Sequence, residues 1–327
     1  MPVRYHPGDA LLTAYRRFGA VIDAGIGPLG CTFLLGSEAN RFVFANAEAF
    51  SWRETFGMLT PTDGHTALMV SDGADHRRRR AVVTPALHRR RIADYVPIMT
   101  KHADAAIDAW RPGQHVDAYQ VFRAAIRTAN TEALFGPRVA AHADALGAHL
   151  EPLLELAHLP TPVARLRERG RRARAAQRGR DDIVSGWIAQ ARRNPRSDDN
   201  VLAALVESDL SDNEIRDQVV SLIADGYETT SGALAWAIYA LLIEPGVWDA
   251  AAEEVHRVLG GRPPTAADID ALGYLGGVVH ETLRLYTPGV ISARKVKQDL
   301  TFDGCRIRSG RMLVFSPYVT HRIAELW

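Results

Sequence analysis

The sequence predicts a mainly α-helical protein with a minor β-sheet. A segment of roughly thirty residues between Ser211 and Pro245 has the pattern of a single helix, about 45 Å long at 1.5 Å per residue. Helical patterns dominate from about residue 75 onward, whereas short strand patterns occur only near the two ends of the chain. We therefore expect one helical domain over residues 1–327, with a small sheet built from both ends.

The composition is that of an ordinary globular protein. Its 327 residues can bury a large core, and 47% of them are hydrophobic, which argues against disorder. The net charge of +1 gives no support to a nucleic-acid binder. The two cysteines, Cys31 and Cys305, form neither a disulfide framework nor a zinc motif, which indicates a reducing, cytoplasmic setting. No apolar run is long enough for a signal peptide or a membrane anchor.

The first half of the chain should contain strands and then helices. Residues 30–44 have the pattern of two short strands around the Gly36-Ser37 turn. Residues 75–110 predict at least two helices with a break near Pro85. The basic stretch from Arg165 to Arg180 predicts a solvated surface helix, with an acidic partner or anionic lipid as alternatives.

The second half begins with the long central helix. Ser211 and Glu214 have the spacing of a capping box, which marks the start of this helix. Pro245 cannot continue it. The remaining predicted elements are a helix from Val247 to Gly260-Gly261, a helix capped by Thr265, a helix that stops before Pro288, and a strand pair around Asp303-Gly304.

An acid and hydroxyls interrupt the apolar surface of the central helix. Asp225, Glu228 and Thr229 lie on neighbouring faces of one helical turn, and Gly226 leaves room for a group to approach the backbone. Buried polar groups without partners are unfavourable, and an acid beside an alcohol in a dry interior can relay protons. We therefore expect Glu228 and Thr229 to be buried and to line the largest cavity. The alternative is a kinked helix whose polar groups are satisfied by hydrogen bonds.

Two further clusters carry weaker signals. Glu281 and Arg284 have the i,i+3 spacing of an ion pair, which is common on exposed helix faces. His76 and Arg80 share a helix face, and two such donors suit a pair of carboxylates. The alternative for the run of arginines is a solvated basic face or a nucleic-acid patch.

Taken in order, these motifs resemble the cytochrome P-450 family of haem-thiolate monooxygenases. The segment 226–230, Gly-Tyr-Glu-Thr-Thr, matches the oxygen-activation motif of that family, which assigns proton delivery to Glu228 and Thr229. The resemblance implies that His76, Arg80 and Arg294 bind the propionates of haem b and therefore converge in space.

The same resemblance covers nearly the whole chain. Glu281 and Arg284 match the structural Glu-Arg pair of the family, so we expect both to be buried and bonded to each other. Residues 316–322 resemble the segment that follows in many members. The pocket-forming segments would be residues 51–69 and 157–180.

The chain departs from the family pattern at two places. Asp225 stands where the family usually has a small residue, and this extra acid could affect proton delivery or bind substrate. The glycine-rich loop with the iron-ligating cysteine follows all the motifs above, and the sequence ends at Trp327 before it. Neither Cys31 nor Cys305 has the context of that ligand, so we expect no iron ligand among these residues and a domain that is incomplete at its C-terminus.

The resemblance implies a haem-dependent monooxygenase that oxidises a small hydrophobic molecule with O2. It also implies electrons from a ferredoxin- or flavoprotein-type redox partner, a monomeric state and no membrane anchor. We expect this chain to be inactive as given. One alternative is a non-catalytic fragment without haem, and another is a helical nucleic-acid-binding or regulatory protein.

Overall fold

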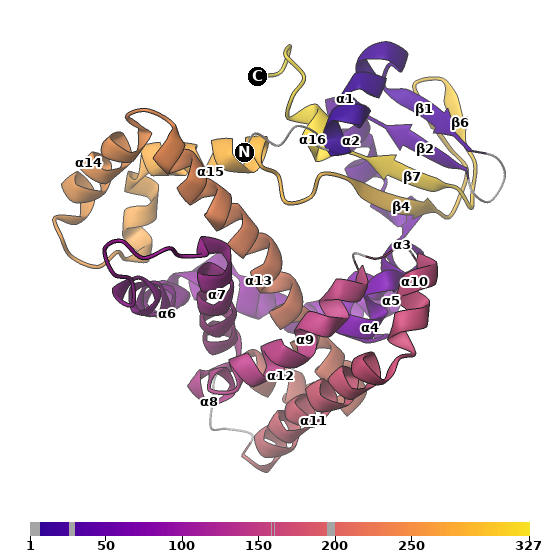
Figure 1. Cartoon of the computed structure of the whole chain (residues 1–327). Coiled ribbons are helices and arrows are strands. Elements are labelled where there is room, and N and C mark those ends of the chain that lie inside the picture. The colour runs from indigo at the N-terminus through magenta and orange to yellow at the C-terminus, as the bar shows by residue number, and fades with distance from the viewer. Residues whose placement is uncertain (1–6, 26–29, 158, 160, 195–199) are drawn as a thin grey trace. The chain divides into compact units, whose positions relative to one another are not determined.

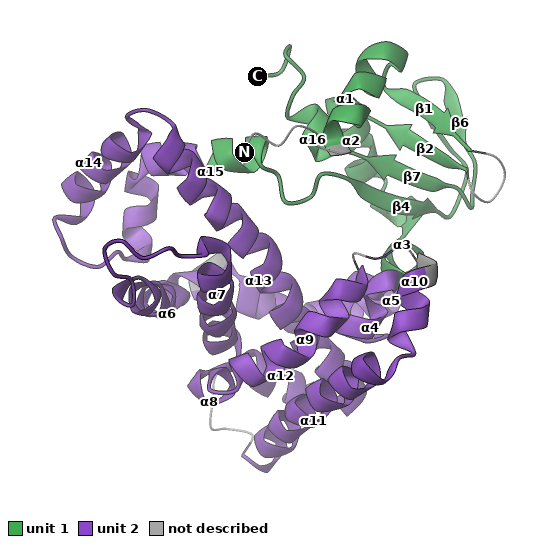
Figure 2. Ribbon diagram, in the orientation of Figure 1, with its two compact units in different colours: residues 1–57, 280–327 green, residues 58–279 purple. Residues whose placement is uncertain are grey.

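The structure is a computed structural model that describes residues 7–25, 30–157, 159, 161–194 and 200–327 (Figure 1). The chain divides into two compact units (Figure 2). Unit 1 comprises residues 1–57 and 280–327, and unit 2 comprises residues 58–279. Each unit is described by itself below, and the expectation of a single domain stays a prediction.

Unit 1 contains the sheet, and both ends of the chain contribute strands to it, as predicted. The strand order is β1-β2-β7-β4-β3. The two ends meet where β2 and β7 pair in parallel, and the other pairs are antiparallel. Leu34, Leu313 and Phe315 lie on its buried face. The strands are β1 (Val21–Ala24), β2 (Cys31–Leu34), β3 (Phe50–Ser51), β4 (Ser292–Val296) and β7 (Met312–Phe315).

The remaining elements of unit 1 correct one prediction. The segment after Gly36 is a helix, α2 (Ser37–Ala45), rather than a second strand. Ala39 and Val43, four residues apart, are both buried, so helical spacing places the apolar side chains on the core. The other elements are α1 (Pro7–Phe18), η2 (Ala47–Ala49), α3 (Trp52–Phe56), α16 (Pro317–Thr320) and the predicted hairpin of β5 (Leu300–Phe302) and β6 (Cys305–Ile307).

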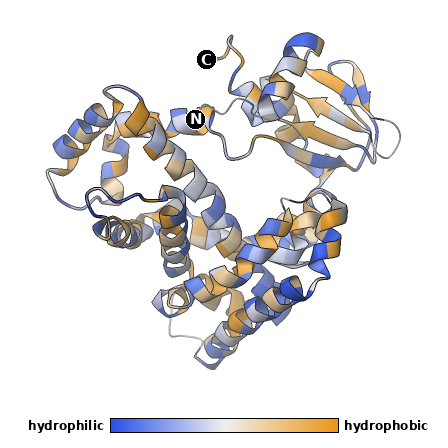
Figure 3. Cartoon of the chain, viewed as in Figure 1, coloured by the Kyte–Doolittle hydropathy of each residue, from blue (hydrophilic) through white to orange (hydrophobic). Residues whose placement is uncertain are grey.

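Unit 2 is helical, and hydrophobic and hydrophilic positions alternate along its helices (Figure 3). Its core forms where Ile215, Val219 and Ile223 of the longest helix pack with side chains of other helices. The elements are α4 (Thr60–Asp63), η4 (Leu68–Val70), α5 (Gly73–Val83), η5 (Thr84–Leu87), α6 (Arg89–Asp108), α7 (Ala118–Phe135), α8 (Pro137–Ala140), α9 (Ala143–Ala157), α10 (Thr161–Glu168), α11 (Arg171–Arg193), α12 (Val201–Glu207), α13 (Asp212–Ile243), α14 (Val247–Leu259) and η6 (Ala266–Ala271). Two elements span the division between the units, η3 (Gly57–Leu59) and α15 (Gly273–Leu285).

The 32 residues of α13 confirm the predicted central helix. The capping box of Ser211 and Glu214 is present at its start. Within the described residues, no helix by itself has the length and apolar character of a membrane span, although α13 and α14, bent by 108°, meet that criterion as a pair.

Glu214 also joins α13 to α5. Its carboxylate accepts hydrogen bonds from Arg78 and, at 3.0 Å, from Nε of Arg79. Arg79 is buried and donates a further bond to Ser71 Oγ at 2.9 Å. Although burial opposes ionisation, hydrogen bonds from Ser211 and the two arginines prevail and lower the pKa of Glu214 to about 2. The start of α13 is therefore tied electrostatically to the middle of α5.

We expect Glu214→Gln to lower the free energy of unfolding at neutral pH by up to about 3 kcal/mol. The folded-state pKa lies below the ordinary value of 4.5, so the stabilisation exists above about pH 4.5 and is lost as the pH falls towards 2. Urea unfolding at a series of pH values between neutrality and about 2 measures this loss of stability. The exposed pair of Glu38 and Arg41 supplies the control, because Glu38→Gln should change stability by less than about 1 kcal/mol. Equal acid sensitivity of wild type and Glu214→Gln would contradict the expectation.

Candidate functional site

The candidate site in unit 2 lies on one turn of α13. The carboxylate of Glu228 is half-buried and accepts two hydrogen bonds from α7. Tyr119 Oη donates to Oε2 at 2.8 Å, and Arg123 Nε donates to Oε1 at 2.6 Å. Arg123 also bonds Glu151 at 2.7 Å. Burial is the largest cause that raises the pKa of Tyr119, to about 12, and the hydrogen bond to Glu228 is the second. Glu228 is therefore held as an acceptor by two strong donors.

Thr229 corrects the expectation of a buried pair. The structure places this residue at the surface of the chain, and its hydroxyl donates only a long bond, 3.5 Å, to the carbonyl of Asp225. The core side of this turn belongs instead to Tyr227 and Ser231, which are fully buried. Because successive helical residues are rotated by about 100°, Tyr227 and Thr229 cannot both face the core.

Asp225 is one of two carboxyls whose charge acts on the buried Asp63. Its Oδ2 accepts a hydrogen bond from Ser221 Oγ at 2.9 Å. Asp225 is accessible to solvent, yet protein atoms crowd its carboxyl closely enough for desolvation to raise its pKa. Asp63, at the end of α4, is 1% exposed, and neither of its carboxyl oxygens has a hydrogen-bond partner within the described chain. Burial, and then the charges of Asp225 and Asp217, raise the pKa of Asp63 to about 8 against the opposing charge of Arg180.

Gly226 has the close approach that its position predicts. A Cβ atom at this residue would lie 2.2 Å from Nδ2 of Asn130 on α7. The same Nδ2 donates to the carbonyl of Leu222 at 3.3 Å. The approaching group is therefore a side chain of this protein, and a Cβ at residue 226 would require the amide of Asn130 to move.

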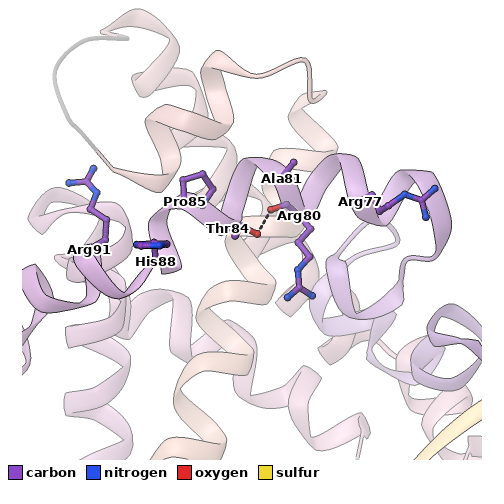
Figure 4. A pocket seen from close by; sticks show the side chains of 7 residues that line it. All are labelled: Arg77, Arg80, Ala81, Thr84, Pro85, His88 and Arg91. Atoms are coloured by element: carbon purple, nitrogen blue, oxygen red, sulfur yellow. Dashed lines mark hydrogen bonds between the residues drawn. The ribbon is translucent and has the colours of Figure 1, made fainter. Parts of the chain in front are cut away.

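The two donors expected to bind carboxylates lie on α5 and differ in burial. His76 is half-buried, and Arg80 is exposed. Arg80 lines an open pocket with a volume of about 740 Å³, and its carbonyl accepts a 2.7 Å bond from Thr84 (Figure 4). Glu228 and Thr229 do not line this pocket. Its lining residues are Arg77, Arg80, Ala81, Thr84, Pro85, His88 and Arg91.

Arg294 lies on β4 of unit 1 and is a buried cation. It is 5% exposed and stacks on the Trp52 ring, 3.8 Å from guanidinium carbon to ring centroid. Its described hydrogen bonds go to Ser292 Oγ and the carbonyl of Ala293, and no carboxylate within the described residues pairs with it. Burial alone lowers its pKa to about 10. His76 and Arg80 belong to unit 2, so their convergence with Arg294 stays a prediction.

The expected Glu281–Arg284 pair forms, but one partner is not buried. Nε of Arg284 donates to Glu281 at 2.8 Å, and its NH1 donates to the carbonyl of His321, also at 2.8 Å. The side chain of Glu281 is 55% exposed, whereas that of Arg284 is 18% exposed. The expectation of burial was therefore wrong for Glu281, and Arg284 is only half-buried.

Three residues of this site carried no readable signal in the sequence. Tyr119 and Arg123 share a face of α7, but an i,i+4 pair of this kind is ordinary on any helix. Asp63 lies in a Thr-Pro-Thr-Asp-Gly stretch that is typical of an exposed turn. Only the long-range packing against α13 gives these side chains their roles.

Cysteine and metal-ligand geometry give no site in the described part of the chain. Cys31 is half-buried in β2, Cys305 is exposed in β6, and both are free thiols. No group of three His, Cys, Asp or Glu side chains there is arranged to hold a metal ion.

Comparisons with known proteins agree with this architecture. The sequence model described as Cytochrome P450 matches residues 4–327. A protein of Mycobacterium tuberculosis named as cytochrome P450 139 is 58% identical over 336 residues, which cover 99% of this chain and 78% of the relative. Cyclooctatin synthase of Streptomyces melanosporofaciens is 34% identical over 94% of this chain and 71% of its own length. The solved structure of retinoic acid-bound cyanobacterial CYP120A1 has the same fold, with a TM-score of 0.83, 23% identity and coverage of 98% of this chain and 75% of that chain.

Proposed function

We infer the roles of individual residues from one premise: this chain belongs to the cytochrome P450 family. It is accordingly a haem monooxygenase, an oxidoreductase that incorporates oxygen from O2. Members of the family generally act on hydrophobic substrates and take electrons from redox partners. The alternative of a helical nucleic-acid-binding or regulatory protein is therefore set aside.

We propose that Thr229 and Glu228 support proton delivery during oxygen activation. The observation that carries this role is the placement of both on one turn of α13, with Glu228 fixed by Tyr119 and Arg123. The hydroxyl of Thr229 can accept and donate a proton at the same atom, and its position at the surface of the described chain leaves it accessible to a reactant.

We expect Thr229→Ala to leave haem binding intact and to divert electrons into peroxide. Loss of a positioned hydroxyl should lower the yield of product per electron by about tenfold, less than the roughly hundredfold lower end of the effects of general acids, because Glu228 and solvent remain. Product and peroxide are measured together in the haem-loaded enzyme. Thr230→Ala is the matched control, because Thr230 is the neighbouring exposed threonine and bonds the Gly226 carbonyl at 3.0 Å. Unchanged coupling in Thr229→Ala would refute the role.

We further propose that Arg294, His76 and Arg80 bind the haem carboxylates. Arg294 fits such a group, because a desolvated guanidinium without a carboxylate partner in the described chain is unfavourable until an anion reaches it. Bound haem would supply the oxygen chemistry, while these residues would fix its orientation. We propose that the iron ligand is neither Cys31 nor Cys305. The backbone of Cys31 lies opposite Met312 in the sheet, and that of Cys305 lies opposite Phe302 in the hairpin.

Arg294→Met should have opposite effects on folding and on haem. The haem-free chain should be as stable as wild type or more stable, because a buried cation without a carboxylate is removed. Haem affinity should fall by about tenfold or more, since a charge-assisted hydrogen bond is lost. Urea unfolding and haem titration measure the two effects. The control is Arg306→Met, which removes an exposed ion pair with Asp299 and should change neither the stability nor the haem affinity strongly. Destabilisation with unchanged haem affinity would show that Arg294 is purely structural.

We propose that an acidic redox partner, of ferredoxin or flavoprotein type, docks on the pocket of Figure 4. Apart from Arg80, which is assigned above to the haem carboxylates, the basic residues that line it are Arg77, His88 and Arg91, and no acidic side chain does. A surface of one sign attracts a partner of opposite charge and raises the association rate. The monomeric state and the small hydrophobic substrate stay predictions.

Reversal of charge at this pocket should weaken electron delivery. We expect Arg77→Glu to raise the KM for the reduced partner by about tenfold and to flatten its dependence on salt, because one favourable charge becomes unfavourable. Steady-state kinetics at several salt concentrations measure this. Arg172→Glu, at an exposed position of α11, is the control for net charge. Equal effects of the two variants would indicate that overall charge, and not this pocket, governs docking.

A further inference from the structure

We propose that the corner between α10 and α11 binds the surface of a membrane that contains anionic lipids. This α10–α11 corner is an exposed set of six arginines and two apolar side chains in unit 2. Its members are Val163, Arg165, Leu166, Arg167, Arg169, Arg171, Arg174 and Arg178. The inference goes beyond the proposed function, and it does not depend on the role of Thr229 or of Arg294.

The helix α10 presents an apolar and basic face to solvent. Its exposed residues Val163, Leu166 and Arg167 have the i, i+3, i+4 spacing of neighbours on one helix face. Leu166 is 76% exposed and Val163 is 42% exposed. The half-buried residues Ala164 and Glu168 point away from this face. Apolar side chains that lie beside cations and outside the core are typical of helices that bind at a membrane interface.

The start of α11 continues the arginines of α10. Arg171, Arg174 and Arg178 are exposed and follow one another at i, i+3 and i+7, so they form one stripe along the helix. The opposite side of α11 carries Ala173 and Ala176, which are buried with leucines of α9. The arginine stripe therefore faces away from the core of unit 2.

A tight turn at Gly170 joins the two helices. The N–H of Gly170 donates to the carbonyl of Arg167 at 2.9 Å, and the N–H of Arg174 donates to the carbonyl of Gly170 at 3.2 Å. A Cβ atom at Gly170 would lie 2.8 Å from the Arg167 carbonyl. The turn thus keeps Arg167, Arg169 and Arg171 close along the chain where α10 meets α11 (Figure 1).

The chain does not neutralise the charge of this corner. Among the described residues, none of the six arginines forms an ion pair with a carboxylate. The exposed Arg41, Arg192 and Arg306, in contrast, each pair with a nearby acid. Glu168 is the only acid between residues 161 and 180, although the whole chain has a net charge of only +1. A local excess of positive charge of this kind is complementary to an anionic surface.

The exposed apolar side chains favour lipid over other anions. A nucleic acid would neutralise the arginines but leave Val163 and Leu166 in water. A membrane interface accommodates both kinds of side chain, because apolar groups enter the boundary beneath the headgroups while arginines stay beside the phosphates. Clusters of about four to eight basic residues on an amphipathic helix are typical of such peripheral binding.

Co-sedimentation of the full chain with lipid vesicles tests the charge of the corner. Mixed phosphatidylglycerol and phosphatidylcholine vesicles should bind the chain about tenfold or more tightly than vesicles of phosphatidylcholine alone, and salt should weaken this binding. Arg171→Gln combined with Arg174→Gln should lower the affinity about thirtyfold, roughly fivefold for each arginine. Arg192→Gln combined with Arg193→Gln is the matched control, because it removes the same charge further along α11. Equal losses in the two double variants would overturn the proposal.

A second variant tests the insertion of apolar side chains. Leu166→Ser should weaken binding to the mixed vesicles by about tenfold, because the leucine no longer leaves water. Leu242→Ser, at another exposed leucine, is the control and should bind as wild type does. Urea unfolding should give the same midpoint for all variants of exposed corner residues. Unchanged vesicle binding by Leu166→Ser would overturn the proposal, as would wild-type binding to polyuridylate without binding to vesicles.

Discussion

The ion pair between Arg79 and Glu214 fixes the relation between the two functional helices of unit 2. Glu214 closes the capping box of α13 and at the same time accepts from a buried arginine of α5. Arg79 is anchored in turn to Ser71, before its own helix begins. Because the N-terminus of a helix carries partial positive charge, an acid in its first turn is favourable as well. The carboxylate of Glu214 thus caps the start of α13 and also holds the side of α5 that carries Arg78 and Arg79 towards α13.

On α13, the buried Tyr227 stands in the sequence between two acids, Asp225 and Glu228. Tyr227 is fully buried, and the guanidinium carbons of Arg123 and Arg127 lie 5.4 and 5.7 Å from its ring centroid. Glu228 accepts hydrogen bonds from Tyr119 and Arg123 of α7. Asp225 accepts one from Ser221, one turn earlier on its own helix, and desolvation raises its pKa. Two carboxyls only three residues apart therefore have different surroundings, and packing rather than residue type determines them.

Local features of this fold could be predicted, whereas contacts between distant segments could not. The capping box at Ser211, the end of α13 before Pro245 and the close approach at Gly226 all depend on neighbouring residues or on a missing side chain. The partners of Glu228 lie more than one hundred positions away in sequence, and no periodicity reports them. The prediction of a strand after Gly36 was wrong. Phe42 and Phe44 alternate as in a strand, but the buried residues of this segment, Ala39 and Val43, are four positions apart as in a helix.

The four arginines of α5 look interchangeable in the printed sequence but have separate environments. Arg79 is buried against Glu214, Arg78 is half-exposed, and Arg77 and Arg80 line the open pocket. Deletion of any one of them yields the same shortened run of arginines, whichever codon is lost. Each helical position turns by about 100° and rises by 1.5 Å, so such a deletion would rotate every later residue of α5 out of register with His76. A pairwise alignment would record only a one-residue gap of arbitrary position, although the change would keep an arginine three residues after His76 and turn Val83 out of its buried position.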